Sequence, residues 1–299
     1  MYPWLVPTFE QLAARKQSSK LHHALLLQGP LGIGKTDFAR QFASLLLCSN
    51  STNGKRCNVC HACMLHDAGN HPDFHEVVSD KQIGVDQIRE AIKKLSGSAQ
   101  LSGAKVLIIY AAHTMTESSA NALLKTLEEP TANTFLMLLS HKAERLLPTI
   151  ISRCERITMP IPDIRQTQDW LSTQWDKPVD AEFIRLYASS PLTLLEELQQ
   201  EQKISYEVFK TGLQDVIQQR VNPSQLAADW QEQVEKILKW LQFWLHLQVK
   251  SQTELPDTLW QLHQHAIQAV KRVRNPGVNK VLVLNQLLTD IAQLTSVKN

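Results

Sequence analysis

The sequence has no long hydrophobic run. Hydrophobic residues make up 43% of the 299 residues and charged residues 20%, which is the balance of a globular chain. No apolar stretch approaches the roughly 20 residues that a membrane helix needs. The segment from Met1 to Pro7 also lacks the basic start and the uninterrupted apolar stretch of a signal peptide. We therefore expect a cytoplasmic protein with no membrane partner.

The chain also lacks a large excess of either positive or negative charge. The formal net charge is only +2, so the composition does not by itself demand a nucleic-acid partner. Internal repeats are not evident. A chain of this length exceeds one ordinary hydrophobic core, which predicts two or three domains.

Strand and helix patterns alternate in the first half of the chain. Buried strands are predicted at residues 21–28, 105–109 and 134–139, and helices at 37–47, 84–95 and 117–128. This alternation indicates a parallel α/β sheet.

Strand patterns end after the proline-rich segment 159–162 (MPIP), which we take as a domain boundary. The rest of the chain is predicted to be helical, with breaks at Pro223, Pro256 and Pro276. The predicted domains are an α/β domain over 1–162, a small helical domain over 163–205 and a helical domain over 206–299.

A phosphate-binding loop lies between the first predicted strand and helix. Residues 29–36 (GPLGIGKT) match the pattern GxxxxGK[ST] in the strand–loop–helix context that this motif requires. Glycines let backbone N–H groups surround phosphate oxygens, the lysine reaches the β- and γ-phosphates, and the threonine hydroxyl faces Mg²⁺. The predicted nucleotide-binding residues are Gly29, Gly32, Gly34, Lys35 and Thr36.

The carboxylates that ATP hydrolysis needs are absent from the end of the neighbouring strand. P-loop ATPases place one acidic residue at this strand end to hold the metal ion, and AAA+ enzymes add a second acidic residue that orients the attacking water. The strand at 105–109 instead continues into Tyr110 and Ala111. Glu117 is the alternative acid for an autonomous ATPase, but capping and the helix dipole explain a carboxylate just after Thr116. We predict ADP or ATP binding without hydrolysis.

Four cysteines form the pattern C-x8-C-x2-C-x2-C, within a module at about 48–66. In a cytosolic protein this spacing favours a metal over disulfides. Four thiolates suit a structural Zn²⁺ with no open position for water. The alternatives are a mixed site, in which His61 or His66 replaces one cysteine, and a knuckle that grips DNA. The predicted ligands are Cys48, Cys57, Cys60 and Cys63.

Two further segments carry a family resemblance. Residues 118–130 (SSANALLKTLEEP) and 152–154 (SRC) resemble motifs of the AAA+ subunits of the bacterial DNA polymerase III clamp loader. The resemblance covers most of residues 1–162. It implies an AAA+ P-loop domain with a zinc-binding insertion, a small helical lid domain and an all-α collar domain that holds a ring of subunits together.

The resemblance is to the ATPase-deficient, delta-prime branch of this family. The ATPase subunits have an Asp–Glu pair where this chain has Tyr110 and Ala111, and a nucleotide-sensing arginine where it has Leu192 or Thr193. The resemblance implies a stator in DNA replication, within the DNA-directed DNA polymerase (nucleotidyltransferase) holoenzyme. The implied partners are the tau/gamma ATPase subunits and the delta subunit, and, through the complex, the sliding clamp and primer-template DNA.

The same resemblance implies that Arg153 is an arginine finger, which enters the ATP site of a neighbouring subunit. A guanidinium can offset the charge that develops on a transferring phosphoryl group. The alternatives are an ordinary surface arginine, or that role for Arg145 or Arg156. In the last domain, Trp240, Phe243 and Trp244 broaden the apolar stripe of a helix, and the sequence leaves open whether they are core or interface residues.

Overall fold

The computed structural model describes residues 1–101, 103–200, 204–252, 256–273, 275 and 277–296. These residues divide into two compact units. The first comprises residues 1–179 and 187–198, and the second comprises residues 180–186 together with the chain from 199 onward. Residues of the predicted small helical domain fall in both units, and the division into three domains stays a prediction.

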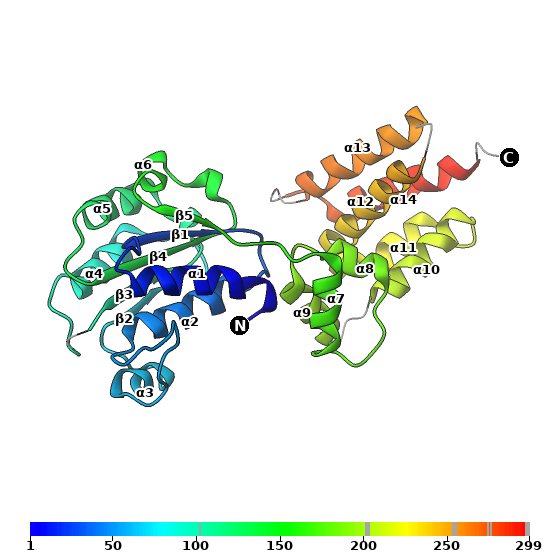
Figure 1. Cartoon of the computed structure of the whole chain (residues 1–299). Helices are drawn as coiled ribbons and strands as arrows, with labels where there is room; N and C mark the ends of the chain where they lie inside the picture. Colours follow the sequence, from blue (N-terminus) through cyan, green and yellow to red (C-terminus); the bar gives the residue numbers. More distant parts are fainter. Residues whose placement is uncertain (102, 201–203, 253–255, 274, 276, 297–299) are drawn as a thin grey trace. The chain divides into compact units, whose positions relative to one another are not determined.

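The first unit is built on a five-stranded parallel sheet in the order β2-β3-β4-β1-β5 (Figure 1). This order places β1 in the interior of the sheet, next to β4, so the loop that leaves β1 emerges among the carboxyl ends of its neighbours. In open parallel sheets ligands bind at such ends. The strands are β1 (Ala24–Gln28), β2 (Phe74–Val77), β3 (Lys105–Ile109), β4 (Thr134–Ser140) and β5 (Glu155–Thr158).

Helices cover both faces of this sheet (Figure 1). Alternate residues of the central strands, such as Leu107 and Leu136, form one buried cluster with the apolar faces of α4 and α5. The intervening residues face α2, whose Phe38 and Phe42 are fully buried. The helices of this unit are η1 (Pro3–Leu5), α1 (Val6–Gln17), α2 (Lys35–Leu47), α3 (His61–Asp67), α4 (Val85–Leu95), η2 (Ala112–Thr114), α5 (Glu117–Glu128), η3 (Ala143–Arg145), α6 (Pro148–Ile151), α7 (Ile164–Ser172) and α9 (Pro191–Gln199).

The predicted parallel α/β sheet is confirmed, and β3 has the predicted bounds. The first predicted strand is shorter than expected, because residues 21–23 precede β1. Two strands, β2 and β5, were not predicted. Their sequences, FHEV and ERIT, mix charged with apolar residues, as edge strands do, and each pairs with one neighbour only.

The second unit is helical throughout its described residues. Trp240 is 1% exposed and packs against Phe183, Tyr206 and Phe209 with ring centroids 5.4 to 6.0 Å apart, so it is a core residue. Phe243 and Trp244 are half-buried. The helices are α8 (Ala181–Leu186), α10 (Tyr206–Ile217), α11 (Pro223–Asp229), η4 (Gln231–Gln233), α12 (Val234–Ser251), α13 (Asp257–Arg272) and α14 (Lys280–Ser296).

The predicted helix breaks fit this unit. Pro223 begins α11, and Pro256 immediately precedes α13. Pro276 lies outside the described residues. None of the helices that the structure describes combines the length and the apolarity needed to cross a membrane.

Candidate functional site

The phosphate loop joins β1 to the first turn of α2. Gly32 and Gly34 have φ angles of +71° and +97°, in the left-handed region that favours glycine. Both also pack too tightly for a side chain. A Cβ on Gly34 would lie 2.4 Å from the ring of Tyr2, and one on Gly32 would lie 2.3 Å from Oγ1 of Thr193. The glycine spacing is thus a requirement of this fold as well as of phosphate binding.

The lysine of the motif is held inside the loop. Lys35 is 8% exposed, and its Nζ donates hydrogen bonds to the carbonyl oxygens of Gly29 at 2.7 Å and Pro30 at 2.5 Å. Burial lowers the pKa of Lys35 to about 8. A bound anion would restore the full positive charge, since an opposite charge nearby favours the protonated amine.

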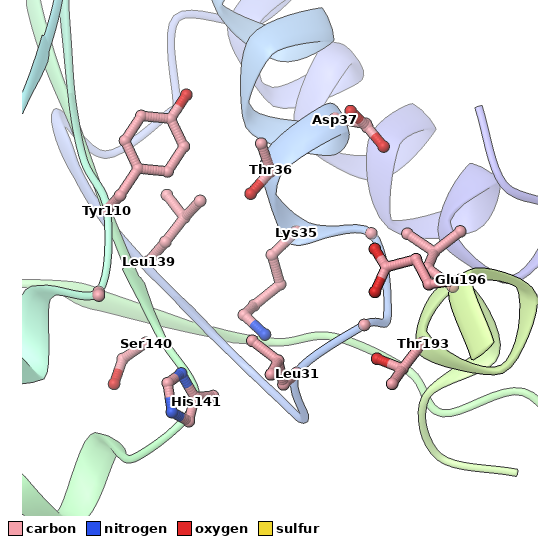
Figure 2. Close-up of a pocket in the computed structure, with 14 residues that line it drawn as sticks. Leu31, Lys35, Thr36, Asp37, Tyr110, Leu139, Ser140, His141, Thr193 and Glu196 are labelled. Atoms are coloured by element: carbon pink, nitrogen blue, oxygen red, sulfur yellow. The ribbon is translucent and has the colours of Figure 1, made fainter. Parts of the chain in front are cut away.

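A cavity of about 490 Å³ opens in front of the loop (Figure 2). It gathers side chains from the loop and α2, the carboxyl ends of β3 and β4, and α9. Its volume falls in the range of small-molecule sites. The lining residues are Leu31, Gly32, Gly34, Lys35, Thr36, Asp37, Tyr110, Ala111, Leu139, Ser140, His141, Leu192, Thr193 and Glu196.

The positions of the missing acids lie in this cavity. Tyr110 donates a hydrogen bond from its hydroxyl to Glu76 of β2, and that hydroxyl accepts one from Nε of Arg40 at 3.0 Å. Ala111 has a φ of +45°, a strained angle for a residue with a Cβ. Glu117, the alternative acid, begins α5 after its cap Thr116 and is not a lining residue.

The residues of α9 for which the resemblance implies a missing nucleotide-sensing arginine also reach the loop. The backbone N–H of Leu192 donates to the carbonyl of Gly32 at 3.0 Å, and both Leu192 and Thr193 line the cavity. The charged side chain that α9 adds to the lining is Glu196. This face of the cavity therefore presents a carboxylate and no cation to a phosphate.

Several residues of the site were not predicted from the sequence. The N-terminal Tyr2 donates to the carboxylate of Asp37 at 2.5 Å, and Trp4 donates from Nε1 to the carbonyl of Ile33 at 2.9 Å. These bonds fasten the first residues to the phosphate loop. The sequence of the segment 1–7 speaks only against a signal peptide, and nothing in its local pattern indicates these contacts.

A pair of histidines also went unpredicted. His113 follows β3 and His141 follows β4, and their rings meet edge to face with centroids 4.2 Å apart. Burial lowers the pKa of His113 to about 4, with further contributions from His141 and nearby cations. Nδ1 of His113 lies 3.1 Å from Oγ of Ser140, the last residue of β4. Strand ends from different parts of the sequence bring these groups together.

The four predicted metal ligands lie together beside the C-terminal end of α2. The ligand sulfur atoms of Cys48, Cys57, Cys60 and Cys63 all lie within 4.8 Å of one another. The Cys48 sulfur is 3.6 Å from that of Cys57 and 4.0 Å from that of Cys60. Thiolates about 2.3 Å from a tetrahedral ion would be about 3.8 Å apart. The four cysteines could therefore hold a metal ion.

The electrostatics of this cluster favour a cation at its centre. Burial opposes ionisation of Cys60, but hydrogen bonds from the backbone of Cys63 and Ser49 lower its pKa to about 6. Burial and the neighbouring thiols raise the pKa of Cys63 to about 12. Full ionisation of the cluster thus requires a positive charge. His61 and His66 lie outside the cluster of metal-ligating atoms found among the described residues.

Arg153 lies apart from the cavity, just after α6. Its Nε donates to the carboxylate of Glu128 at 2.6 Å, and its Nη1 donates to the carbonyl of Thr149 at 3.0 Å. The side chains of Arg153 and Glu128 are 32% and 48% exposed, so this ion pair lies at the surface. Such pairs contribute about 0 to 1 kcal/mol, which lets the guanidinium exchange partners easily.

Comparison with known proteins assigns the chain to a family. The family described as "DNA polymerase III, delta subunit" matches residues 6–163. DNA polymerase III subunit delta' of Pseudomonas aeruginosa is 38% identical over 236 residues, which are 77% of this chain and 71% of the relative. This chain belongs to the DNA polymerase III delta-prime family. The subunit delta' of Escherichia coli K12 is also 38% identical, over 80% of this chain and 73% of its own length.

A solved structure supports the fold of this family member. The crystal structure of a DNA polymerase III gamma subunit-related protein from Thermotoga maritima aligns with a TM-score of 0.56. The alignment covers 95% of this chain and 99% of that one at 17% sequence identity. At this identity the likeness concerns the fold alone.

Proposed function

We propose that this chain is the stator, or delta-prime, subunit of a DNA polymerase III clamp loader in DNA replication. It hydrolyses no ATP of its own and supplies Arg153 to the ATP site of an adjacent ATPase subunit. Together with the tau/gamma ATPase subunits and the delta subunit it forms a ring, which opens a sliding clamp and loads it onto primer-template DNA. Membership of the delta-prime family supports a place in this complex. The absence of acidic residues directly after β3 supports a subunit that does not itself hydrolyse ATP.

The observation that carries this proposal is the pairing of Tyr110 with Glu76 and Arg40. These contacts turn a position where ATPases need a free carboxylate into part of a packed polar cluster. The alternative of an autonomous ATPase is not favoured, because Glu117 lies outside the cavity. What the chain retains is a half-buried arginine at the surface, in the SRC motif.

Arg153 suits a role in trans. Its guanidinium is the charge that a γ-phosphoryl group in transit requires, and arginine can bind two phosphate oxygens at once. The partner Glu128 holds it at the surface rather than in a core, so a neighbouring ATP site can take it over at small cost.

The test is ATP turnover by the reconstituted complex with Arg153→Ala in this chain. We expect assembly to persist and turnover at the contacted site to fall about 10³-fold, the lower end of the effect of removing an arginine finger. Arg145→Ala and Arg156→Ala are matched controls, because both residues are exposed on the same unit. Unchanged turnover in the Arg153 variant, or an equal loss in either control, would sink the assignment.

We also propose that the four cysteines bind one structural Zn²⁺ and that the phosphate loop binds ADP or ATP without hydrolysis. The sulfur spacing suits the first, and the buried Lys35 in a cavity of suitable volume supports the second. Calorimetric titration with ADP at millimolar concentration tests the nucleotide site, with Lys35→Ala as the variant that should abolish the signal.

The division into α/β, lid and collar domains remains part of this proposal. Half-buried Phe243 and Trp244 are our candidates for subunit contacts in the collar, whereas Trp240 belongs to the core. Their substitution by alanine should weaken co-purification with the ATPase subunits while leaving the helical content of the free chain unchanged.

A further inference from the structure

The nucleotide cavity is poorly matched to the magnesium ion that normally accompanies ATP in a P-loop. Such sites hold Mg²⁺ through the loop's Ser or Thr hydroxyl and a carboxylate at the end of a neighbouring strand. Thr36 supplies the hydroxyl, but the strand ends in Tyr110 and Ala111. Mg²⁺ demands oxygen ligands in near-octahedral geometry. A methyl group offers none, and the phenol is engaged elsewhere.

The engagement of Tyr110 also joins it to an ion pair between Arg40 and Glu76. Arg40 lies one helical turn beyond Thr36 on α2, and its guanidinium contacts both the Tyr110 hydroxyl and Glu76. Burial and the nearby Glu76 raise the pKa of Tyr110, so the hydroxyl stays a neutral phenol. The Glu76 carboxylate is therefore already held by Arg40 and Tyr110 and is not free to coordinate a divalent ion beside Thr36.

The two carboxylates that line the cavity do not replace the missing ligand. Asp37 accepts the hydrogen bond from Tyr2 and points away from Tyr110 (Figure 2). Glu196 comes from α9 and lies beside Thr193, on the other side of the phosphate loop from Tyr110 (Figure 2). The Thr36 hydroxyl is thus left without a carboxylate partner in this lining.

Side chains that can donate hydrogen bonds to an anion line the phosphate end instead. The amine of Lys35 points into the cavity, and His141 lines it at the carboxyl end of β4 (Figure 2). Burial, together with the charges of Lys142 and Lys35, lowers the pKa of His141, so the imidazole is neutral near pH 7 when no anion is bound. An anion beside His141 would favour its protonation, because opposite charges attract.

We propose that this cavity binds its nucleotide as the metal-free polyphosphate, with Lys35 and His141 in place of Mg²⁺. The proposal rests on the nucleotide site suggested above and defines the chemical form of its ligand. Excess Mg²⁺ weakens binding, because it neutralises the phosphates in solution and finds no free carboxylate beside Thr36 in this lining.

The test is calorimetric titration of the full chain with ADP, in EDTA and in excess Mg²⁺ at matched ionic strength. We expect the Kd to be about tenfold higher in Mg²⁺, since the metal neutralises phosphate charge that Lys35 would otherwise attract. A Kd that is equal or lower in Mg²⁺ overturns the proposal. No binding in either condition overturns the nucleotide site as well. The role of Arg153 is tested separately, by ATP turnover in the reconstituted complex.

Three variants identify the groups responsible. His141→Gln should raise the Kd for ADP in EDTA about tenfold, as expected for loss of a hydrogen bond to a charged group. The control Lys125→Gln, at an exposed lysine of α5 outside the lining, should change it less than twofold.

Two further variants address the metal. Arg40→Gln releases Glu76 from its ion pair and should reduce the penalty that Mg²⁺ imposes. The pair Tyr110→Asp with Ala111→Glu supplies the acids and should reverse the preference, so that ADP binds more tightly with Mg²⁺. Equal Kd changes in the His141 and Lys125 variants, or an unaltered Mg²⁺ penalty in both the acid-containing and the Arg40 variants, contradict the proposal.

Discussion

The first unit contains two places where a cation would be expected, and they differ in what surrounds them. Beside the end of α2, four sulfur atoms converge on a common centre with spacings that suit one tetrahedral ion. At the end of β3, the expected oxygen ligands are replaced by Tyr110 and Ala111, with Arg40 close by. One place brings four possible ligand atoms together, and the other presents a phenol and a methyl group beside an ion pair between Arg40 and Glu76.

This difference separates structural from catalytic metal chemistry in a single domain. A structural ion contributes to folding whatever the activity of the protein, so a stator retains a use for the cysteines. A catalytic ion is useful only where hydrolysis occurs. The phosphate loop has a structural use apart from any metal. Gly32 and Gly34 are needed for packing against α9 and the N-terminal residues.

The largest effect is expected for Cys60→Ser, which tests the four-cysteine metal site. We expect loss of the zinc and, with it, most of the roughly 10 kcal/mol by which such ions favour folding of small zinc modules. Metal analysis should fall from about one zinc per chain to none, and proteolysis should become rapid within residues 48–66. Cys154→Ala is the matched control, since that buried cysteine lies outside the cluster. Retention of zinc by the Cys60 variant would contradict the four-thiolate site.

The sequence was sufficient to predict the sulfur site and the phosphate loop because both are local. Three of the cysteines fall within seven residues, and Cys48 immediately follows a helix whose start is marked by the loop itself. Short spacings fix which atoms can meet. The central strands were equally predictable, because strands buried on both faces are continuous apolar runs.

The rest of the site depends on contacts between distant segments. Tyr110 meets Arg40 across 70 residues, and Tyr2 meets Asp37 across 35. The loss of acids at β3 was visible in the sequence, but not the cluster that replaced them. His113 and His141 come together only because β3 and β4 are adjacent in the sheet. Strand order is a property of the whole fold, so these neighbours could not be inferred from local pattern.

The second prediction tests whether the hydrogen bonds of Tyr110, just after β3, stabilise the fold. Tyr110→Phe removes the hydroxyl that joins Glu76 and Arg40, and we expect the free energy of unfolding to fall by about 1 kcal/mol. Urea denaturation of this variant, of Arg40→Gln and of the double variant completes a cycle. The two losses should not add, because both remove the same contact. Additive losses would show that Tyr110 and Arg40 act independently.

The third prediction concerns acid and the histidine pair. The pKa of His113 is about 4 in the folded chain, below its ordinary value of 6.5, so the unfolded chain binds the proton more readily. The contribution of a neutral His113 to the free energy of unfolding is therefore fully present above pH 6.5 and is lost as the pH falls toward 4. His113→Gln should lose less stability than the unaltered chain between pH 7 and pH 4.5, measured by thermal unfolding. The same pH dependence in both proteins would contradict the shift.

The smallest expected effect belongs to the ion pair that holds Arg153. Glu128→Gln removes an exposed partner, so the stability of the free chain should change by less than about 1 kcal/mol. Because Nε, Nη1 and Nη2 of Arg153 all contact atoms of its own chain, the guanidinium must leave Glu128 to serve a neighbour. ATP turnover by the complex should then rise, by at most the roughly fivefold that 1 kcal/mol allows. Glu129→Gln, the adjacent exposed acid, is the control and should leave turnover unchanged. A fall in turnover with Glu128→Gln, like that expected for Arg153→Ala, would instead mean that Glu128 orients the finger rather than competing for it.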